Sequence, residues 1–565
     1  MLRLTSRLAR RSLTMPPSRK SSTEVPPKGY IVDPSAGPML RFQASLPRLP
    51  VPTISSTAHK YLETVRPHLN PAEYAQTEAS VHAFMASPQA AELQKRLEAR
   101  AAEPGMLNWL SEWWNDAAYM AYFYVHADDR LRTKPAQRAA ALLKAMLPFR
   151  QMTETKELEP EKVRGAPLCM DSYKWLPPIP PRKFDPATHN HVVFVRKNKF
   201  FSVPLVHSSG QELSAAELET CPGDSYGTPV GVLTSDNRDN WTDAREVLAA
   251  DPANAASLEA IESAMIVVCL DDTKPVTREE MSTACWVIVF DNGRSGFLGE
   301  HSCMDGTPTL RMNEFPTLGA PTNETLPSPT ELAFNLNPTT RDLIKGAESR
   351  FDALVAAHEL HVLHYEGYGK EVAKGFGASP DAWAQLAAQT RKYQLGRTEV
   401  IRSASNESKA WAEAMLDPAE SDGEAGCAVQ ESCDEASAVR CVGGGRAGCG
   451  PAFIRVEEDG EGWGGVACDL FGWGVRETGH WELSTSQLSS PYLEGWGYGE
   501  VVPDGYGLSY AIGERYIRWT ITSTRGDAAQ LRHYLAEAAT ELRDMMERAA
   551  KEEKKEMSME GKAKL

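Results

Sequence analysis

"WVIVFDNGRSGFLGEH" occupies residues 286–301 and leads from an apolar run to a single histidine. The first five letters, WVIVF, are typical of a short buried strand, and the D-N-G that follows is a turn signal. A second short segment ends at His301, and Asp305 follows four residues later. We therefore expect His301 at the exit of a strand, where it could be a general base, a metal ligand or a surface residue.

Strand and helix patterns are mixed along the rest of the chain. Residues 191–206 (HVVFVRKNKFFSVPLV) predict two strands joined by a turn at 196–198, and residues 264–272 (AMIVVCLDD) predict another buried strand. Residues 107–125 predict a buried aromatic helix, and residues 339–366 predict a helix that leads into a polar turn. This mixture predicts the α/β class.

Length, charge and cysteine content limit the choice of partners and compartment. The 565 residues allow two or more domains, and the formal net charge of −16 argues against nucleic acid as a partner. The sequence has no apolar run long enough to span a bilayer, although a peripheral contact with the inner membrane stays open. Ten cysteines occur without a C-x-x-C pair, which favours a reduced intracellular protein and argues against a zinc site.

Both ends of the chain resemble targeting signals. Residues 1–25 are basic and serine-rich with no acid before Glu24, a composition typical of a mitochondrial presequence, although a disordered basic tail is the alternative. The last three residues, AKL, are a conservative variant of the peroxisomal S-K-L tripeptide. Initiation at Met15 would remove most of the presequence. The ends thus predict a mitochondrial form, on the inner-membrane or matrix side, and a form delivered by the peroxisomal import receptor.

Three histidines stand three residues apart in HELHVLH, at positions 358, 361 and 364. Zinc sites of the H-E-x-x-H type need histidines four apart on a helix. Because the second histidine arrives one residue early, we expect a cluster on a helix face or the alternation of a strand, and no metal site.

The strongest chemical candidate is His301. It can act as a general base if one group orients its ring and another donates to an oxyanion. Asp305 and Glu300 are close enough in sequence to orient the ring. The segment ELSTSQ offers hydroxyl donors at Ser484 and Ser486.

A basic segment adds a second element to this chemistry. Lys370 and Lys374 precede Ser379 and Asp381, and the two lysines could neutralise a phosphate. A base, hydroxyl donors and a basic patch suggest acyl transfer between the thioester of a phosphorylated carrier and an alcohol. A purely structural role for His301 stays open, since a histidine after a strand is often structural.

Collinear segments from about residue 46 to residue 546 resemble one family, the carnitine/choline acyltransferases. They are LPRLPVP, LNWLSEWW, GAPLCMDSY, GVLTSDNRDNW, GEHSCMDGTPT, GKEVAKGFGASPDAWAQLA, GRTEVIRSAS, ELSTSQ and VVPDGYGLSY. Within the family the chain most resembles the fungal members that act on acetyl groups, which also pair a presequence with an A-K-L-type ending.

The resemblance implies an α/β fold of two domains, each similar to chloramphenicol acetyltransferase, with an active-site tunnel between them. The implied N-terminal domain, with the catalytic histidine, covers residues 40–335, and the C-terminal domain covers 336–550. The first helices would pack on the C-terminal half. Residues 551–565 would form a charged tail, and a monomer is expected.

The resemblance also implies roles for single residues. His301 would be the base, Asp305 would hold its ring, and Ser486 would donate to the oxyanion. Carnitine would contact Thr398 and Ser484. Coenzyme A, a substrate and not a bound cofactor, would contact Lys370, Lys374, Ser379, Asp381 and Gln487. L-carnitine and acetyl-CoA are the implied substrates, and Trp496, at the position that sets acyl length in the family, implies acetyl or propionyl transfer; Trp496 packed elsewhere is the alternative.

The chain departs from the family pattern in several places. A segment between QLAAQ and GRT, whose Tyr and Ser contact carnitine in the family, is absent, and Gly377 stands where the family has a lysine facing CoA. These departures keep open an impaired or inactive relative. A choline acetyltransferase is the other alternative, although Thr398 suits a substrate that carries a carboxylate.

Residues 424–473 match nothing in the family, although both flanks match. With one base dropped, the codons of Cys449 to Glu458 can spell VDRHLFGLKK, which contains the family's D-R-H-L-x-G-L string. Val466 to Gly472, shifted in the same way, can spell LPAIFSD, which is also family-like. Our hypothesis is that this stretch is translated in the wrong frame.

Overall fold

The computed structural model describes residues 26–113, 121–128, 132–163, 165–175, 190–205, 225–281, 287–301, 306–314, 329–380, 406, 409–410, 413 and 480–563. The hypothesis about residues 424–473 lies outside these residues, as do residues 1–25, where a presequence is expected, and residues 564–565 of the expected AKL signal. Among the described residues, none of the helices combines the length and the apolar character needed to cross a bilayer.

Helices and strands are mixed along the described chain, as the α/β class predicts. The α-helices are α1 (Gly37–Leu40), α2 (Ile54–Val65), α3 (Pro71–Met85), α4 (Pro88–Ala101), α6 (Pro135–Glu154), α8 (Arg238–Ala249), α9 (Pro252–Glu262), α10 (Gly306–Glu314), α11 (Pro338–Ala357), α12 (Lys370–Gly375) and α19 (Ala528–Ala563). The 3₁₀-helices are η1 (Pro34–Ala36), η2 (Gln43–Ser45), η3 (Arg66–His68), η4 (Asp171–Trp175) and η5 (Val230–Ser235). The strands are β1 (Ala121–His126), β2 (Lys162–Val163), β3 (Ala166–Pro167), β4 (His191–Arg196), β5 (Lys199–Pro204), β6 (Val267–Asp271), β7 (Val287–Phe290), β8 (Ser295–Glu300), β9 (Thr330–Leu332), β10 (Glu359–Tyr365), β11 (Leu483–Gln487), β12 (Leu493–Tyr498), β13 (Tyr506–Ile512) and β14 (Ile517–Ser523).

An eight-stranded mixed sheet has the order β12-β1-β8-β7-β6-β4-β5-β9. The strand–turn–strand prediction for residues 191–206 is confirmed, because β4 and β5 pair antiparallel. Lys197 and Asn198 both have positive φ (49° and 64°), which matches the twist of a tight hairpin. Apolar side chains of α6 pack on one face of this sheet and form the largest core of the described residues.

The prediction of a helix that runs through residues 107–125 is wrong for residues 121–125, which form most of β1. Side chains that alternate between two buried faces explain why these residues form a strand. Tyr122 and Tyr124 lie in the core with α6, whereas Phe123 and Val125 lie in the core on the opposite face. Pairing with β8 on one side and β12 on the other outweighs the helical pattern that the aromatic residues suggest.

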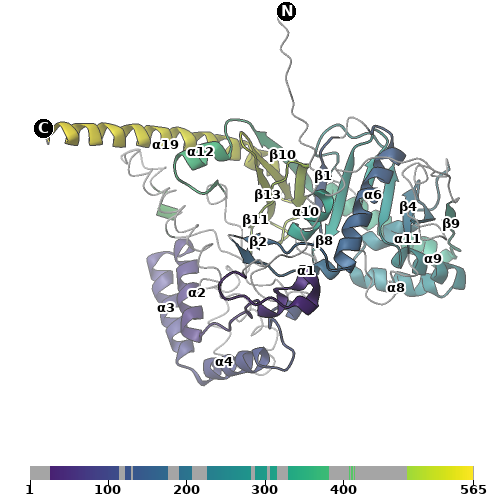
Figure 1. Cartoon of the computed structure of the whole chain (residues 1–565), viewed down its shortest axis with the longest axis horizontal. Coiled ribbons are helices and arrows are strands. Elements are labelled where there is room, and N and C mark those ends of the chain that lie inside the picture. Colours follow the sequence, from purple (N-terminus) through teal and green to yellow (C-terminus); the bar gives the residue numbers. More distant parts are fainter. Residues whose placement is uncertain are drawn as a thin grey trace, which may run out of the picture.

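A four-stranded sheet has the order β10-β14-β13-β11, and α19 packs across one of its faces. The helix predicted for residues 339–366 ends at Ala357, and β10 follows in place of the polar turn. In Figure 1 the start of α19 lies against this sheet, the rest of the helix extends away from it, and helices α2, α3 and α4 form a separate group.

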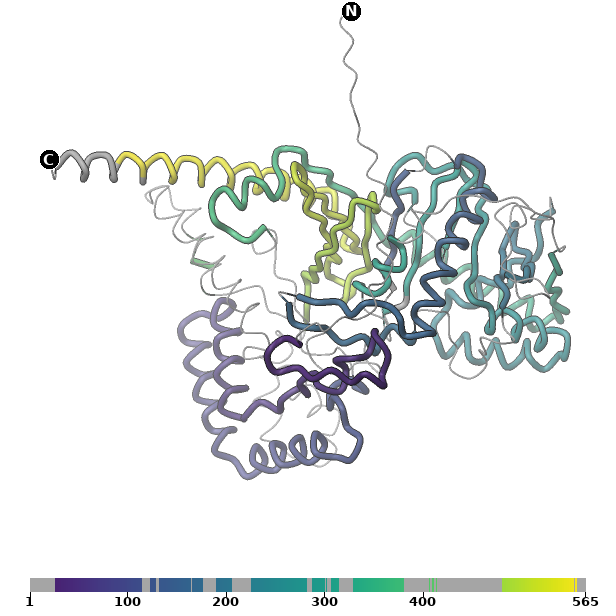
Figure 2. Tube along the Cα trace, viewed as in Figure 1, coloured from purple at the N-terminus to yellow at the C-terminus, as the bar shows by residue number. Residues whose placement is uncertain are grey.

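Two elements that follow the expected domain boundary at residues 335/336 pack on elements that precede it. Strand β12 follows that boundary by more than a hundred residues, yet it pairs with β1 in the larger sheet. The tube in Figure 2 shows the late strands, in yellow-green, directly beside the earlier ones in blue and teal. Helix α11 also follows the boundary, and its Ile344 and Ala347 join the core of η5, α8 and α9.

Candidate active site

His301 directly follows β8, as the sequence predicts, and its side chain is half-buried. Its ring stands edge-on to Tyr122 on the neighbouring strand, with ring centroids 5.5 Å apart and an interplanar angle of 86°. Gly299 makes room for this arrangement, because a Cβ there would lie 2.6 Å from the Tyr122 ring. The glycine in GFLGEH therefore allows Tyr122 to reach the histidine.

Helix α10 is held against β1 by a row of hydrogen bonds. Tyr122 donates to Thr309 Oγ1 (2.7 Å), and the hydroxyl of Tyr124 lies 3.0 Å from both Gly306 O and Thr309 Oγ1. At the other end of the row, His126 Nε2 lies 2.9 Å from Asn313 Oδ1. These bonds hold α10, from its first residue Gly306 onward, beside β1, the strand whose Tyr122 also contacts His301.

His126 is a fully buried polar residue in this row. Its Nδ1 lies 2.9 Å from Ser295 Oγ, which also accepts a hydrogen bond from Arg138 Nε (3.0 Å). The pKa of His126 is lowered to about 4, mainly by burial and also by the nearby Arg138 guanidinium, while the hydrogen bond to Asn313 opposes this shift. The ring is therefore neutral at physiological pH and acts as a hydrogen-bonding spacer.

Strand β11 carries three of the expected site residues: Ser484 for carnitine, Ser486 for the oxyanion and Gln487 for CoA. Ser484 and Ser486 lie two residues apart, and thus on one side of the strand, with Ser486 exposed and Ser484 half-buried. Gln487 follows them and donates to Ser489 Oγ (2.6 Å). β11 is an edge strand that pairs in parallel with β13. Tyr498 on β12 donates to the main-chain oxygen of Ser484 (2.9 Å).

Trp496 lies in a layer of aromatic rings next to His301. Its side chain is 8% exposed, its register partner on β1 is Tyr124, and its ring centroid is 5.8 Å from that of Tyr498. The indole Nε1 donates to the carbonyl of Tyr510 (3.1 Å). Phe297 stacks on Tyr124 at 5.9 Å and completes the layer. We call Tyr122, Tyr124, Phe297, Trp496 and Tyr498 the aromatic layer.

The basic segment forms α12, beside the turn between β13 and β14. Lys370 is paired with Glu514 (2.6 Å), whose pKa is held below its usual value by the hydrogen bond from Lys370 and by the charge of Lys374. Lys374 is exposed and Ser379 is half-buried. Gly377 has φ = +77°, a conformation that lysine rarely adopts, so the local backbone explains why glycine replaces the lysine expected there.

Asp305, Asp381 and Thr398 lie outside the described residues, as does the side chain of Glu300. The structure thus brings His301 close to Tyr122 and links β11 to Tyr498. The orienting acid and the main carnitine contact stay predictions.

Comparison with known proteins identifies the family. A family model described as "Choline/Carnitine o-acyltransferase" matches residues 49–537. The chain belongs to this family. A mitochondrial carnitine O-acetyltransferase of Saccharomyces cerevisiae is 29% identical over 601 residues, covering 91% of this chain and 89% of the yeast protein. A human carnitine O-acetyltransferase is 28% identical, with 89% and 94% covered, and a bovine peroxisomal carnitine O-octanoyltransferase is 28% identical, with 67% and 75% covered.

The three histidines of HELHVLH do not form a cluster suited to a metal. His361 and His364 lie on β10 three residues apart, so strand alternation places them on opposite faces. His358 pairs with Glu500 (2.8 Å), and His364 Nδ1 accepts a hydrogen bond from Arg518 Nε (3.3 Å). Of the two arrangements expected at this motif, a cluster on a helix face or the alternation of a strand, the structure contains the strand.

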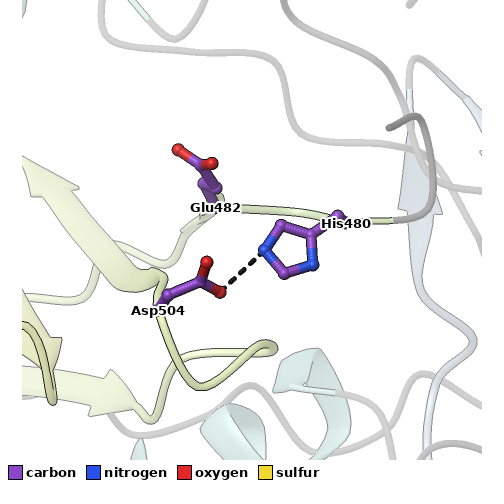
Figure 3. A group of neighbouring side chains, drawn as sticks. All are labelled: His480, Glu482 and Asp504. Carbon is purple, nitrogen blue, oxygen red and sulfur yellow. Dashed lines mark ion pairs between the residues drawn. The ribbon is translucent and has the colours of Figure 1, made fainter. Parts of the chain in front are cut away.

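One group within the described part of the chain has spacing compatible with a metal ion. His480, Glu482 and Asp504 are exposed and offer ligand atoms within 4.8 Å of one another (Figure 3). His480 is already paired with Asp504 (2.7 Å), and this pairing lowers the pKa of the carboxyl, with a further contribution from Arg525. This ion pair connects the residues before β11 to the loop between β12 and β13. The pairing is enough to explain why these side chains lie close together, and no bound metal ion is needed to explain it.

Sequence reasoning missed the residues around His301. The sequence signal that could have found them is the alternation of aromatic residues in YFY (122–124) and WGY (496–498), which is typical of strands. Read as a strand pattern, they place Tyr122, Tyr124, Trp496 and Tyr498 on one face, which is the arrangement the structure contains.

Proposed function

We propose that this family member transfers a short acyl group reversibly between CoA and L-carnitine. The observation that carries the proposal is a link between two segments. His301, at the end of β8, contacts Tyr122, and the register partner of Tyr122, Tyr498, is hydrogen-bonded to the serine-bearing strand β11. The names of the relatives, carnitine O-acetyltransferases and a carnitine O-octanoyltransferase, support carnitine as the acceptor.

His301 would act as the general base in a direct transfer. It takes the proton from the carnitine hydroxyl as that oxygen attacks the thioester carbonyl, and Ser486 donates a hydrogen bond to the resulting oxyanion. When the tetrahedral intermediate collapses, the carbon–sulfur bond breaks and His301 returns the proton to the thiolate of CoA. Asp305 would hold the histidine ring. Because both substrates are held at once, no acyl-enzyme is needed.

The remaining contacts are proposed from the family pattern. CoA would lie along Lys370, Lys374, Ser379, Asp381 and Gln487, and the pairing of Lys370 with Glu514 would be exchanged for a phosphate. Carnitine would contact Thr398 and Ser484. The same proposal includes a tunnel between two chloramphenicol-acetyltransferase-like domains, a monomeric state and no bound cofactor. It also includes two destinations, the mitochondrion and the peroxisome.

Acetyl or propionyl would be the preferred acyl group. The aromatic layer supports this choice, because all five of its side chains are buried in the core of the larger sheet. A short acyl group needs little room, whereas each added methylene would have to displace a ring.

A thiol-release assay tests the proposal. Acetyl-CoA with L-carnitine should release free CoA faster than acetyl-CoA with choline, and octanoyl-CoA with L-carnitine should be slower. A higher rate with choline would favour a choline acetyltransferase instead. Absence of release with every acyl-CoA would favour the second candidate below.

An impaired relative is the second candidate function. The alignment to the yeast enzyme spans 601 residues, more than the 565 of this chain, so parts of that enzyme have no counterpart here. This supports the loss of the carnitine-contacting segment before Thr398. The proposed wrong frame in residues 424–473 would remove the family's arginine as well. Sequencing the transcript tests this: an unbroken frame through 420–480 as translated contradicts it.

A further inference from the structure

Two tyrosines on adjacent strands lie between His301 and strand β11. Tyr122 on β1 and Tyr498 on β12 are register partners, and both are buried, at 3% and 7% exposure. The Tyr122 ring meets His301 edge-on, and the Tyr498 hydroxyl reaches Ser484 on the other side. Through the pairing of their strands, the two tyrosines thus connect the two proposed catalytic elements.

The direction of each hydrogen bond at Tyr498 follows from its single proton. That proton is donated to the main-chain oxygen of Ser484 at 2.9 Å. The contact of 3.4 Å between the two hydroxyls must then have Ser484 as donor. It is long for a hydrogen bond, so the Ser484 hydroxyl is held weakly and can turn toward a ligand, while its backbone stays fixed.

The phenol of Tyr498 keeps its proton over the working range of the enzyme. Burial raises the pKa of Tyr498 well above its usual value, and the hydrogen bond to Ser484 opposes this rise less strongly. The donor that holds Ser484 is therefore present at every pH at which His301 could act as a base.

Strand β11 needs such a tether because of its place in the sheet. It is the last strand of the four-stranded sheet and has β13 as its one neighbour in that sheet. An edge strand held on one side moves more easily than a central strand, whereas stabilisation of an oxyanion requires a donor fixed in advance. Ser486 lies two residues beyond the Ser484 carbonyl, so the hydrogen bond from Tyr498 to that carbonyl also fixes the position of Ser486.

We propose that Tyr498 is a positioning residue: its hydroxyl fixes strand β11, and through its register partner Tyr122 it sets the separation between Ser486 and His301. The effect on catalysis rests on the proposed function, and the anchoring of β11 does not. Tyr498 touches neither substrate in this proposal and acts through Ser484 and Ser486.

Tyr498→Phe tests the proposal, since it removes the hydroxyl and keeps the ring. Turnover should fall about tenfold, the effect of losing one buried hydrogen bond, while the KM for acetyl-CoA stays within about twofold. The matched control is Tyr365→Phe on β10 of the four-stranded sheet, which removes a tyrosine hydroxyl bonded to Thr540 (2.9 Å) of α19. The control should leave turnover unchanged.

Two further measurements separate positioning from general destabilisation. In the background of Ser486→Ala, Tyr498→Phe should lower turnover no further, because its target is already absent. Amide hydrogen exchange at residues 483–487 should be faster in Tyr498→Phe and unchanged in Tyr365→Phe.

Each outcome is decisive. A tenfold loss that disappears in the Ser486→Ala background supports the proposal, and full turnover by Tyr498→Phe, or a loss that multiplies with Ser486→Ala, overturns it. If the unaltered protein transfers no acyl group, the proposed function is rejected, but the anchoring of β11 by Tyr498 is not. The exchange measurement then decides the anchoring: faster exchange in β11 supports it, and equal exchange overturns it.

Discussion

Gly299 shows how one residue determines the surroundings of the candidate base. Any Cβ at this position would collide with the ring of Tyr122, which would have to move away from His301. A methyl group is enough to produce this clash, so the requirement is steric and independent of polarity. The residue-level environment of His301 therefore depends on a glycine that has no chemistry of its own.

At the same scale, His301→Ala should lower turnover by roughly 10²- to 10⁴-fold, because it removes the general base. The melting temperature should change little, since the side chain is half-buried. Steady-state rates with acetyl-CoA and L-carnitine measure the effect, and His361→Ala on β10 serves as a histidine control. Near-normal turnover by His301→Ala would reject the assignment.

Trp496→Gly should shift the preference from acetyl-CoA toward medium-chain acyl-CoA. Removing this buried ring also leaves the Tyr510 carbonyl without its indole donor, and we expect a stability loss of about 3 to 5 kcal/mol. Initial rates with a series of acyl-CoA lengths, normalised to the folded fraction, measure the shift. Trp519→Leu, a buried tryptophan in the core with α19, is the control. An unchanged chain-length profile would show that Trp496 does not line the acyl pocket.

Among the elements, α10 and β1 depend on each other through the row of polar contacts that ends at His126. Because the pKa of His126 is lowered to about 4 from 6.5, the unfolded chain binds an extra proton between these pH values. The free energy of unfolding should therefore be fully retained above about pH 6.5 and fall as the pH drops toward 4, by at most about 3 kcal/mol from this residue.

Denaturant melts of the unaltered protein and of His126→Gln across pH 4 to 7 measure this contribution. The slope of stability against pH should be smaller in His126→Gln. His533→Gln, an exposed histidine paired with Glu537 on α19, should keep the full slope. Identical slopes in all three proteins would contradict the role of His126.

The elements that could be predicted from the sequence are those with local signals. The β4–β5 hairpin is an example, since Asn198 suits the positive φ of its tight turn and apolar runs flank the turn. Strand β1 could not be predicted in this way, because its aromatic residues suit a helix as well as a strand until β8 and β12 supply partners. The position of His301 after a strand was predictable, whereas its neighbour Tyr122 comes from a segment far away in the sequence.

At the scale of the whole molecule, substrate binding is expected to limit the activity of this chain. The absent Tyr/Ser segment and the missing arginine would each remove a charge-assisted contact to carnitine, worth roughly 1.5 to 3 kcal/mol. Losing two such contacts should raise the KM for carnitine by about a hundredfold or more. Parallel assays of this chain and of a chain with both segments restored measure the difference. Equal KM values and equally cooperative melting would show that the unusual segments are a genuine variation.

The pairing of β12 with β1 also has a consequence for synthesis on the ribosome. About 370 residues separate the two strands, and at 5 to 20 residues per second their translation takes roughly 20 to 70 s. Until β12 emerges, β1 lacks its partner on that side and presents a row of unsatisfied backbone groups. The larger sheet is therefore completed late, after nearly the entire polypeptide has left the ribosome. During this long interval a chaperone can bind the nascent chain and keep β1 from pairing wrongly.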